Sequence, residues 1–124
     1  MAHQRNLIYA FSAGRIAFGL ALLAVPGRVG TNWIGEPASH PAVHIAFRAL
    51  GARDIALAAG AALAAARGSD ARPWLALTVA SDLVDLGATL AAGDAVPDRA
   101  RNGTVAVAGG GAVAGAILTA LVEE

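Results

Sequence analysis

Cysteine and lysine are both absent from this chain of 124 residues, and charged residues make up only 15% of it. Without cysteine the chain has no disulfide, no thiolate nucleophile and no metal site with Cys ligands. All nine basic residues are therefore arginine, and nine acidic residues balance them. Because the net charge is zero, the protein has no electrostatic attraction to nucleic acid, and we expect no nucleic-acid partner.

Apolar residues take the place of the missing charges. They make up 56% of the chain, and the mean hydropathy is +0.58. Ordinary soluble domains reach only ~45–50%, a figure that already counts glycine. A soluble bundle would need polar helix faces, and these segments lack the charge to coat them. We therefore expect a multi-pass protein of the bacterial inner membrane, with the lipid bilayer as its partner.

Four apolar segments follow one another, separated by short stretches rich in glycine, proline and charge. They cover about 6–25, 42–66, 73–92 and 103–122, and each approaches the ~20 residues that cross a bilayer as a helix. The sequence thus predicts an all-α fold, a four-transmembrane-helix bundle with short loops that forms a single membrane domain over 1–124. Residues 26–41 form the longest connection and are expected to fold over one face of the bundle, with Ser39 as the cap of the second helix.

The first segment has an alternative interpretation as a signal peptide. Arg15 lies in its middle, and no clear A-x-A cleavage site precedes Pro26. A charge within the apolar region and the lack of a cleavage site both argue against a signal peptide. We therefore predict a retained helix.

Charged residues interrupt the first three apolar segments near the middle of each. A lone charge at the bilayer centre costs at least ~2.5–3.5 kcal/mol, so pairing is expected. Depth along the helices predicts that Arg48 pairs with Asp85 and Asp82. Arg53 and Asp54 point in other directions, one of them toward the first or the fourth helix, and Asp54 is the preferred partner of Arg15. The six charges form a neutral layer at mid-bilayer, namely Arg15, Arg48, Arg53, Asp54, Asp82 and Asp85.

The third segment adds a polar stripe, because residues three or four apart share a helix face. We assign acid and base catalysis to Asp82 and Asp85, and the orientation of these carboxylates to Arg48 and Arg53. The expected substrate-binding residues are Arg15, His44, Asp54, Thr78, Ser81 and Thr89. No helix carries two histidines at metal-ligand spacing, so neither a metal nor another cofactor is expected.

The motif R-x-x-G-x-R-D, formed by Arg48, Gly51, Arg53 and Asp54, precedes a tryptophan and a downstream SDLVD. With this motif and four apolar segments, residues 10 to 120 resemble the small integral membrane proteins of the domain of unknown function 4267. These proteins look like distant relatives of the DoxX-like four-helix membrane proteins. The resemblance implies a four-helix membrane fold and no established activity.

Three functions remain open. The first is an acid–base enzyme for a lipophilic small molecule, by epoxide opening, isomerisation or cyclisation. The second is an accessory or structural membrane subunit, and the third is a proton-coupled transporter acting as a homodimer. Gly111 and Gly115 of the last segment have the small-xxx-small spacing that allows close helix approach. They serve either packing within the bundle or a homodimer through the glycines of the fourth helix.

Overall fold

The computed structural model describes residues 2–122, and within that range it contains helices and no strand. The helices are α1 (Ala2–Ala24), α2 (Pro26–Trp33), α3 (Pro41–Ala66), α4 (Arg72–Ala92), α5 (Asp98–Thr104) and α6 (Gly110–Val122). Short 3-10 turns, η1 (Glu36–Ser39) and η2 (Gly93–Ala95), and a π-helical turn, η3 (Val105–Gly109), complete the order.

Four stretches are long and apolar enough to cross a membrane. They are Ala2–Ala24, Pro41–Ala66, Arg72–Ala95 and Asp98–Val122. The prediction of an all-α bundle with four membrane-spanning helices is therefore confirmed, and the chain is that of a multi-pass membrane protein.

Proline and local caps set the helix boundaries. Pro26 begins α2 and Pro41 begins α3, positions where the missing N–H of proline costs nothing. The cap of α3 is His40, whose Nδ1 accepts a hydrogen bond from the backbone N–H of Ala42 at 3.1 Å. The expectation of Ser39 as the cap was wrong, because the η1 turn takes up that residue. The connection 26–41 is itself mostly helical.

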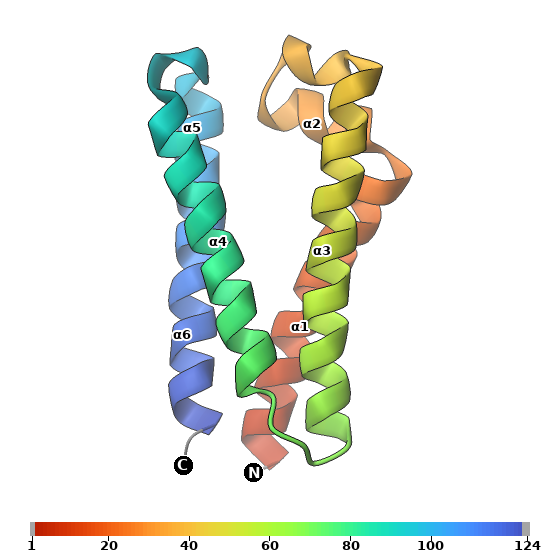
Figure 1. Cartoon of the computed structure of the whole chain (residues 1–124), viewed down its shortest axis with the longest axis vertical. Coiled ribbons are helices and arrows are strands. Elements are labelled where there is room, and N and C mark those ends of the chain that lie inside the picture. Colours follow the sequence, from red (N-terminus) through yellow and green to blue (C-terminus); the bar gives the residue numbers. More distant parts are fainter. Residues whose placement is uncertain (1, 123–124) are drawn as a thin grey trace.

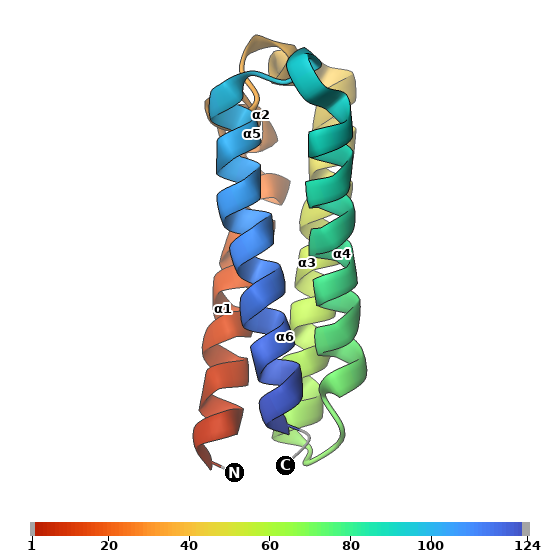
Figure 2. The same ribbon diagram turned by 90° about the vertical axis from the view of Figure 1, so that its left-hand side faces the viewer.

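The long helices form two antiparallel pairs, α1 with α3 and α4 with α6 (Figures 1 and 2). The pairs converge at the end where both termini and the α3–α4 connection lie, and diverge toward α2 and α5 (Figure 1). Within the first pair, a Cβ added to Gly19 would lie 2.6 Å from the carbonyl oxygen of Gly51. Glycine at both positions thus lets the two backbones touch.

Two apolar cores explain why the pairs diverge. The core at the convergent end takes Ile8 from α1, Ala61 from α3, Leu75 from α4 and Leu118 from α6, so it joins all four helices. The core at the other end is built around Leu22, Ala38 and Phe47, with further residues from 18–50 only. Apolar packing therefore holds the two pairs together at one end and leaves a space between them at the other.

Candidate functional site

Arg15 of α1 and Asp82 of α4 form a bidentate ion pair in the interior of the bundle. The guanidinium donates from Nη1 to Asp82 Oδ2 at 2.8 Å and from Nη2 to Oδ1 at 2.7 Å. The two side chains are 14% and 5% exposed. Two parallel charge-assisted hydrogen bonds are the strongest form of such a contact, so this pair fixes α1 against α4.

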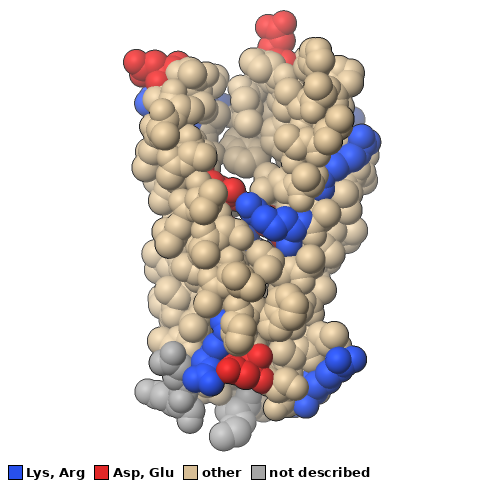
Figure 3. Space-filling model, in the orientation of Figure 1, with Lys and Arg blue, Asp and Glu red and all other residues tan. Residues whose placement is uncertain are grey.

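A second bidentate pair joins α3 to α4. Arg53 donates from Nη1 to Asp85 Oδ1 at 3.0 Å and from Nη2 to Oδ2 at 2.7 Å. These side chains are 31% and 28% exposed. Figure 3 shows basic and acidic atoms meeting at the seam between the two helix pairs. This second pair is the more exposed of the two and therefore lies at the edge of the cluster.

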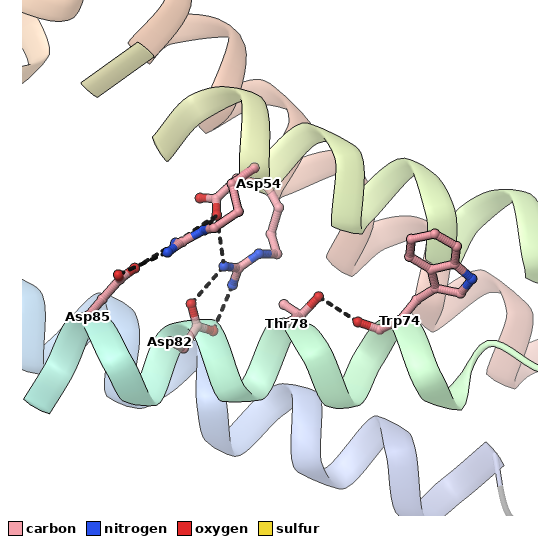
Figure 4. Close-up of polar contacts among 7 residues, drawn as sticks. Asp54, Trp74, Thr78, Asp82 and Asp85 are labelled. Carbon is pink, nitrogen blue, oxygen red and sulfur yellow. Dashed lines mark hydrogen bonds and ion pairs between the residues drawn. The ribbon is translucent and has the colours of Figure 1, made fainter. Parts of the chain in front are cut away.

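Asp54 of α3 connects the two pairs. Its Oδ1 accepts from Arg53 Nη2 at 3.1 Å and from Nε at 3.3 Å, and lies 3.5 Å from Arg15 Nη2. The residue is buried, at 4% exposure. Figure 4 shows the three carboxylates of Asp54, Asp82 and Asp85 converging on the two guanidinium groups between them. We call these five residues, Arg15, Arg53, Asp54, Asp82 and Asp85, the Asp/Arg cluster.

The predicted pairing of Arg48 with Asp85 was wrong. Arg48 is exposed, and its Nε donates to the carbonyl oxygen of Leu23 at 3.2 Å. Five residues turn an α-helix by about 140° beyond a full turn, so Arg48 and Arg53 leave α3 in different directions. The side chain of Arg53 points toward α4 and forms the ion pair with Asp85.

The predicted pairing of Arg15 with Asp54 is present only as the longer contact, since Asp82 is the bidentate partner. With Arg48 outside, the expected neutral layer of six charges becomes a cluster with three carboxylates and two guanidinium groups. One carboxylate in the cluster has no arginine of its own.

A cavity of about 510 Å³ lies between the two helix pairs beside this cluster. Arg15, Asp54, Asp82 and Asp85 form its polar wall. The rest is largely apolar, comes from α1, α2, α3, α5, η3 and α6, and includes the aromatic side chains of Phe11, Phe18 and Trp33. Ligand sites in proteins typically have ~300–1,000 Å³ and combine apolar walls with a few convergent polar groups. The cavity has both properties.

A hydrogen bond between the two halves spans the divergent end of the cavity. Trp33 Nε1 of α2 donates to Thr104 Oγ1 of α5 at 2.9 Å, and both residues line the cavity. Trp33 also packs against Phe18 and Phe47, at ring-centroid distances of 6.3 and 5.9 Å. The sequence did not predict the hydrogen bond or the ring packing of Trp33, because an aromatic residue in a glycine-rich connection is more typical of a membrane interface.

The other predicted binding residues lie outside the cavity wall. Thr78 and Thr89 donate their hydroxyl protons to the carbonyl oxygens of Trp74 and Asp85 within α4, and Figure 4 shows the first of these bonds. Ser81 is half-buried on the same helix. His44 Nε2 lies 3.0 Å from the carbonyl oxygen of Ala38 and fastens the start of α3 to η1. Of the predicted polar stripe, the structure thus brings only the two aspartates to the cavity.

Gly111 of α6 is a component of the site, although its spacing from Gly115 predicted only packing within the bundle or a homodimer. A Cβ at this position would lie 2.6 Å from Asp82 Oδ2 and 3.1 Å from Arg15 Nη1. A Cβ on Gly115 would lie 2.7 Å from Val79 Cγ2. Both glycines therefore make room for neighbours within the chain, which favours packing within the bundle over a dimer motif.

Two polar atoms near the cluster are buried without a hydrogen-bond partner among residues 2–122. They are Arg15 Nε and Ser12 Oγ. The guanidinium carbon of Arg15 lies 5.6 Å from the ring centroid of Phe11, an arrangement in which the ring face attracts the cation. The described residues contain no group of three or more His, Asp or Glu side chains arranged to hold a metal ion.

No model of a protein family, no curated protein and no solved structure matches the chain. The resemblance to the domain of unknown function 4267 therefore stays a prediction, and the site is interpreted from its own geometry.

Proposed function

We propose that this membrane protein binds a lipophilic small molecule in the cavity between its helix pairs and acts on it by acid–base catalysis. One observation carries the proposal, namely that all members of the Asp/Arg cluster except Arg53 form the polar wall of an otherwise apolar cavity. The cluster residues lie near the middle of the candidate membrane-spanning helices. In this proposal the cavity is therefore at the depth of the lipid chains, and a lipophilic molecule would reach it from the bilayer.

The charge of the cluster supports acid–base chemistry. Three carboxylates and two guanidinium groups sum to one negative charge, and a buried net charge is costly in a medium of low dielectric constant. Uptake of one proton makes the cluster neutral. That proton is then available as a general acid, while a second carboxylate of the cluster accepts a proton as the base.

Epoxide opening illustrates how the cluster would act. A carboxylic acid of the cluster transfers its proton to the epoxide oxygen as the C–O bond breaks. Water adds to the carbon, and a carboxylate accepts the proton that the water releases. The product is a diol, and the cluster regains its original proton count. Isomerisation and cyclisation would use the same pair of proton transfers.

The setting that we propose is the bacterial inner membrane, and the proposed relatives are the proteins of the domain of unknown function 4267. Two residues of the motif that carries this resemblance, Arg53 and Asp54, belong to the Asp/Arg cluster. A family built on this motif would therefore share the central part of the cluster.

The experiment is turnover of 1,2-epoxydodecane by the purified protein in nonionic detergent, with the diol measured by gas chromatography and mass spectrometry. Asp82→Asn and Asp85→Asn are each expected to lose about 100-fold or more in rate, the typical contribution of general acid–base catalysis. Asp94→Asn is the control, because Asp94 is exposed in η2. Circular dichroism establishes that the variants fold. Normal turnover in both cluster variants would contradict acid–base catalysis, and a wild type that forms no diol would exclude epoxide opening.

An accessory or structural subunit is the second candidate, and the two bidentate ion pairs favour it. These ion pairs occupy the carboxylates of Asp82 and Asp85, and they join α1 and α3 to α4. A stable partner that copurifies, together with tolerance of Asp82→Asn and Asp85→Asn, would support this function over the enzyme. A proton-coupled transporter is the third proposal, and it predicts pH-dependent uptake of a substrate into liposomes.

A further inference from the structure

We infer that the cavity takes a lipophilic cation, an amine or onium group on an apolar body, with its positive charge at Asp54. This inference rests on the proposed function, because it takes the cavity as the binding site. It adds the chemical class of the ligand, which the acid–base proposal leaves open.

The first step is the charge balance of the cavity wall. The cluster has one carboxylate more than it has guanidinium groups. The nearest further basic groups on α3 are engaged elsewhere, since Arg48 donates to the Leu23 carbonyl and His44 contacts the Ala38 carbonyl. A cationic ligand neutralises the cluster in place of the proton that acid–base catalysis would use, whereas an anionic ligand would add to the negative charge of the unprotonated cluster.

The second step is the location of that charge. Asp82 and Asp85 each receive two short hydrogen bonds from their own arginine, one to each carboxylate oxygen. Asp54 makes its contacts with Arg53 and Arg15 through Oδ1 alone, at 3.1 to 3.5 Å. Its Oδ2 therefore lies outside the ion pairs, and Asp54 lines the cavity. A ligand cation would contact this carboxylate.

The third step is the aromatic lining. Phe11, Phe18 and Trp33 border the same cavity, and the faces of aromatic rings attract ammonium and onium groups. Phe11 already lies beside the guanidinium of Arg15. Phe18 and Trp33 pack against each other and also border the cavity, so the ligand cation would contact the parts of their rings that line it. The aliphatic side chains of the wall would contact its apolar body.

The test compares two probe ions of nearly the same shape and opposite charge, tetraphenylphosphonium and tetraphenylborate. Binding is measured by equilibrium dialysis of the wild-type protein in nonionic detergent. We expect saturable binding of the cation, with an affinity at least about tenfold higher than that of the anion, because even a partly screened contact between charges exceeds the energy of a tenfold change. Equal affinities, or a preference for the anion, would overturn the inference without the use of any variant.

Two substitutions sharpen the test because they shift the cluster charge in opposite directions. Asp54→Asn makes the cluster neutral and is expected to weaken tetraphenylphosphonium binding about tenfold or more. Arg53→Gln gives the cluster a second negative charge and is expected to tighten it. Arg53 is absent from the residues that line the cavity, so the change removes a charge beside the wall and no side chain of the wall itself. A purely structural role would predict weaker binding in both variants, and that result would also overturn the inference.

The two proposals fail in distinguishable ways. If the wild type shows no preference for the cation but converts the epoxide through Asp82 and Asp85, the ligand class is wrong and the enzymatic proposal stands. If the protein binds the cation through Asp54 and converts no epoxide, the ligand class stands and epoxide opening is excluded. Asp94→Asn is expected to match the wild type in both assays.

Discussion

The two ion pairs of the Asp/Arg cluster are alike in geometry and differ in their surroundings. Both are bidentate, and both end on α4 at residues one helical turn apart. The Arg15–Asp82 pair is enclosed, with side chains 14% and 5% exposed, whereas the side chains of Arg53 and Asp85 are 31% and 28% exposed at the seam. Both pairs join α4 to the other helix pair, and the comparison indicates that breaking the enclosed inner pair costs more stability than breaking the more exposed outer pair.

The largest expected effect comes from breaking the inner pair. Arg15→Gln leaves the buried Asp82 carboxylate without its cation, and loss of one partner from a buried pair typically costs 3–5 kcal/mol, so we expect a loss of about that size. Arg53→Gln should lower the free energy of unfolding by less, because the side chains of Arg53 and Asp85 are 31% and 28% exposed and solvent screens their interaction. Unfolding by titration with sodium dodecyl sulfate, followed by circular dichroism, measures both.

The double variant Arg15→Leu with Asp82→Leu is the control for this prediction. Since it removes both charges, it should recover most of the stability that Arg15→Gln loses. Equal losses for Arg15→Gln and Arg53→Gln would contradict the distinction between the two pairs.

A smaller effect is expected from disturbing the inner pair without removing a charge. The added Cβ of Gly111→Ala would lie 2.6 Å from Asp82 Oδ2, so the carboxylate must move away from Arg15. Overpacking of this kind costs roughly 1–3 kcal/mol. Gly87→Ala is the matched control, because a Cβ on Gly87 has no atom within 4 Å and alanine favours a helix over glycine. The same unfolding titration would contradict this account if both variants kept wild-type stability.

The smallest effect is expected at an ion pair between Asp70, in the α3–α4 connection, and Arg72, the first residue of α4. The Arg72 guanidinium donates to Asp70 at 2.8 Å, and the Arg72 backbone N–H donates at 2.9 Å. These hydrogen bonds hold the pKa of Asp70 below its usual range. The stabilisation is therefore complete above the ordinary aspartate pKa of ~4 and is lost as pH falls through the lowered value.

Asp70→Asn should thus have a slightly lower unfolding midpoint than the wild type at neutral pH. The difference should disappear in acid, once the wild-type carboxylate is protonated. A difference between the two proteins that is independent of pH would show that the charge of Asp70 makes no contribution.

The sequence predicted the helices and the depth of the charges, and it failed at the choice of partners. Segment length and apolar content determine where a chain crosses a membrane, so the four spans were predictable. Partner choice depends on the direction in which each side chain leaves its helix after packing. That is why Arg48 was assigned to Asp85, although Arg53 of the same helix has the direction toward α4.

Contacts between distant segments could not be predicted from the sequence for the same reason. Trp33 and Thr104 are 71 positions apart, and neither residue carries a signal for the other. The role of Gly111 depends on how closely α6 approaches Asp82. The sequence predicted a neutral layer, and the cluster has an excess carboxylate because Arg48 lies outside it.

The most direct test of the central claim, that the Asp/Arg cluster faces a binding cavity, is to fill that cavity without altering the cluster. Gly14 lines the cavity, and a Cβ there has no atom within 4 Å. Tetraphenylphosphonium binding is measured for Gly14→Phe and for Gly87→Phe, whose glycine is equally open and lies outside the cavity lining. We expect Gly14→Phe to lose binding with an unchanged unfolding midpoint and Gly87→Phe to bind as the wild type does. Wild-type binding by Gly14→Phe would contradict the claim.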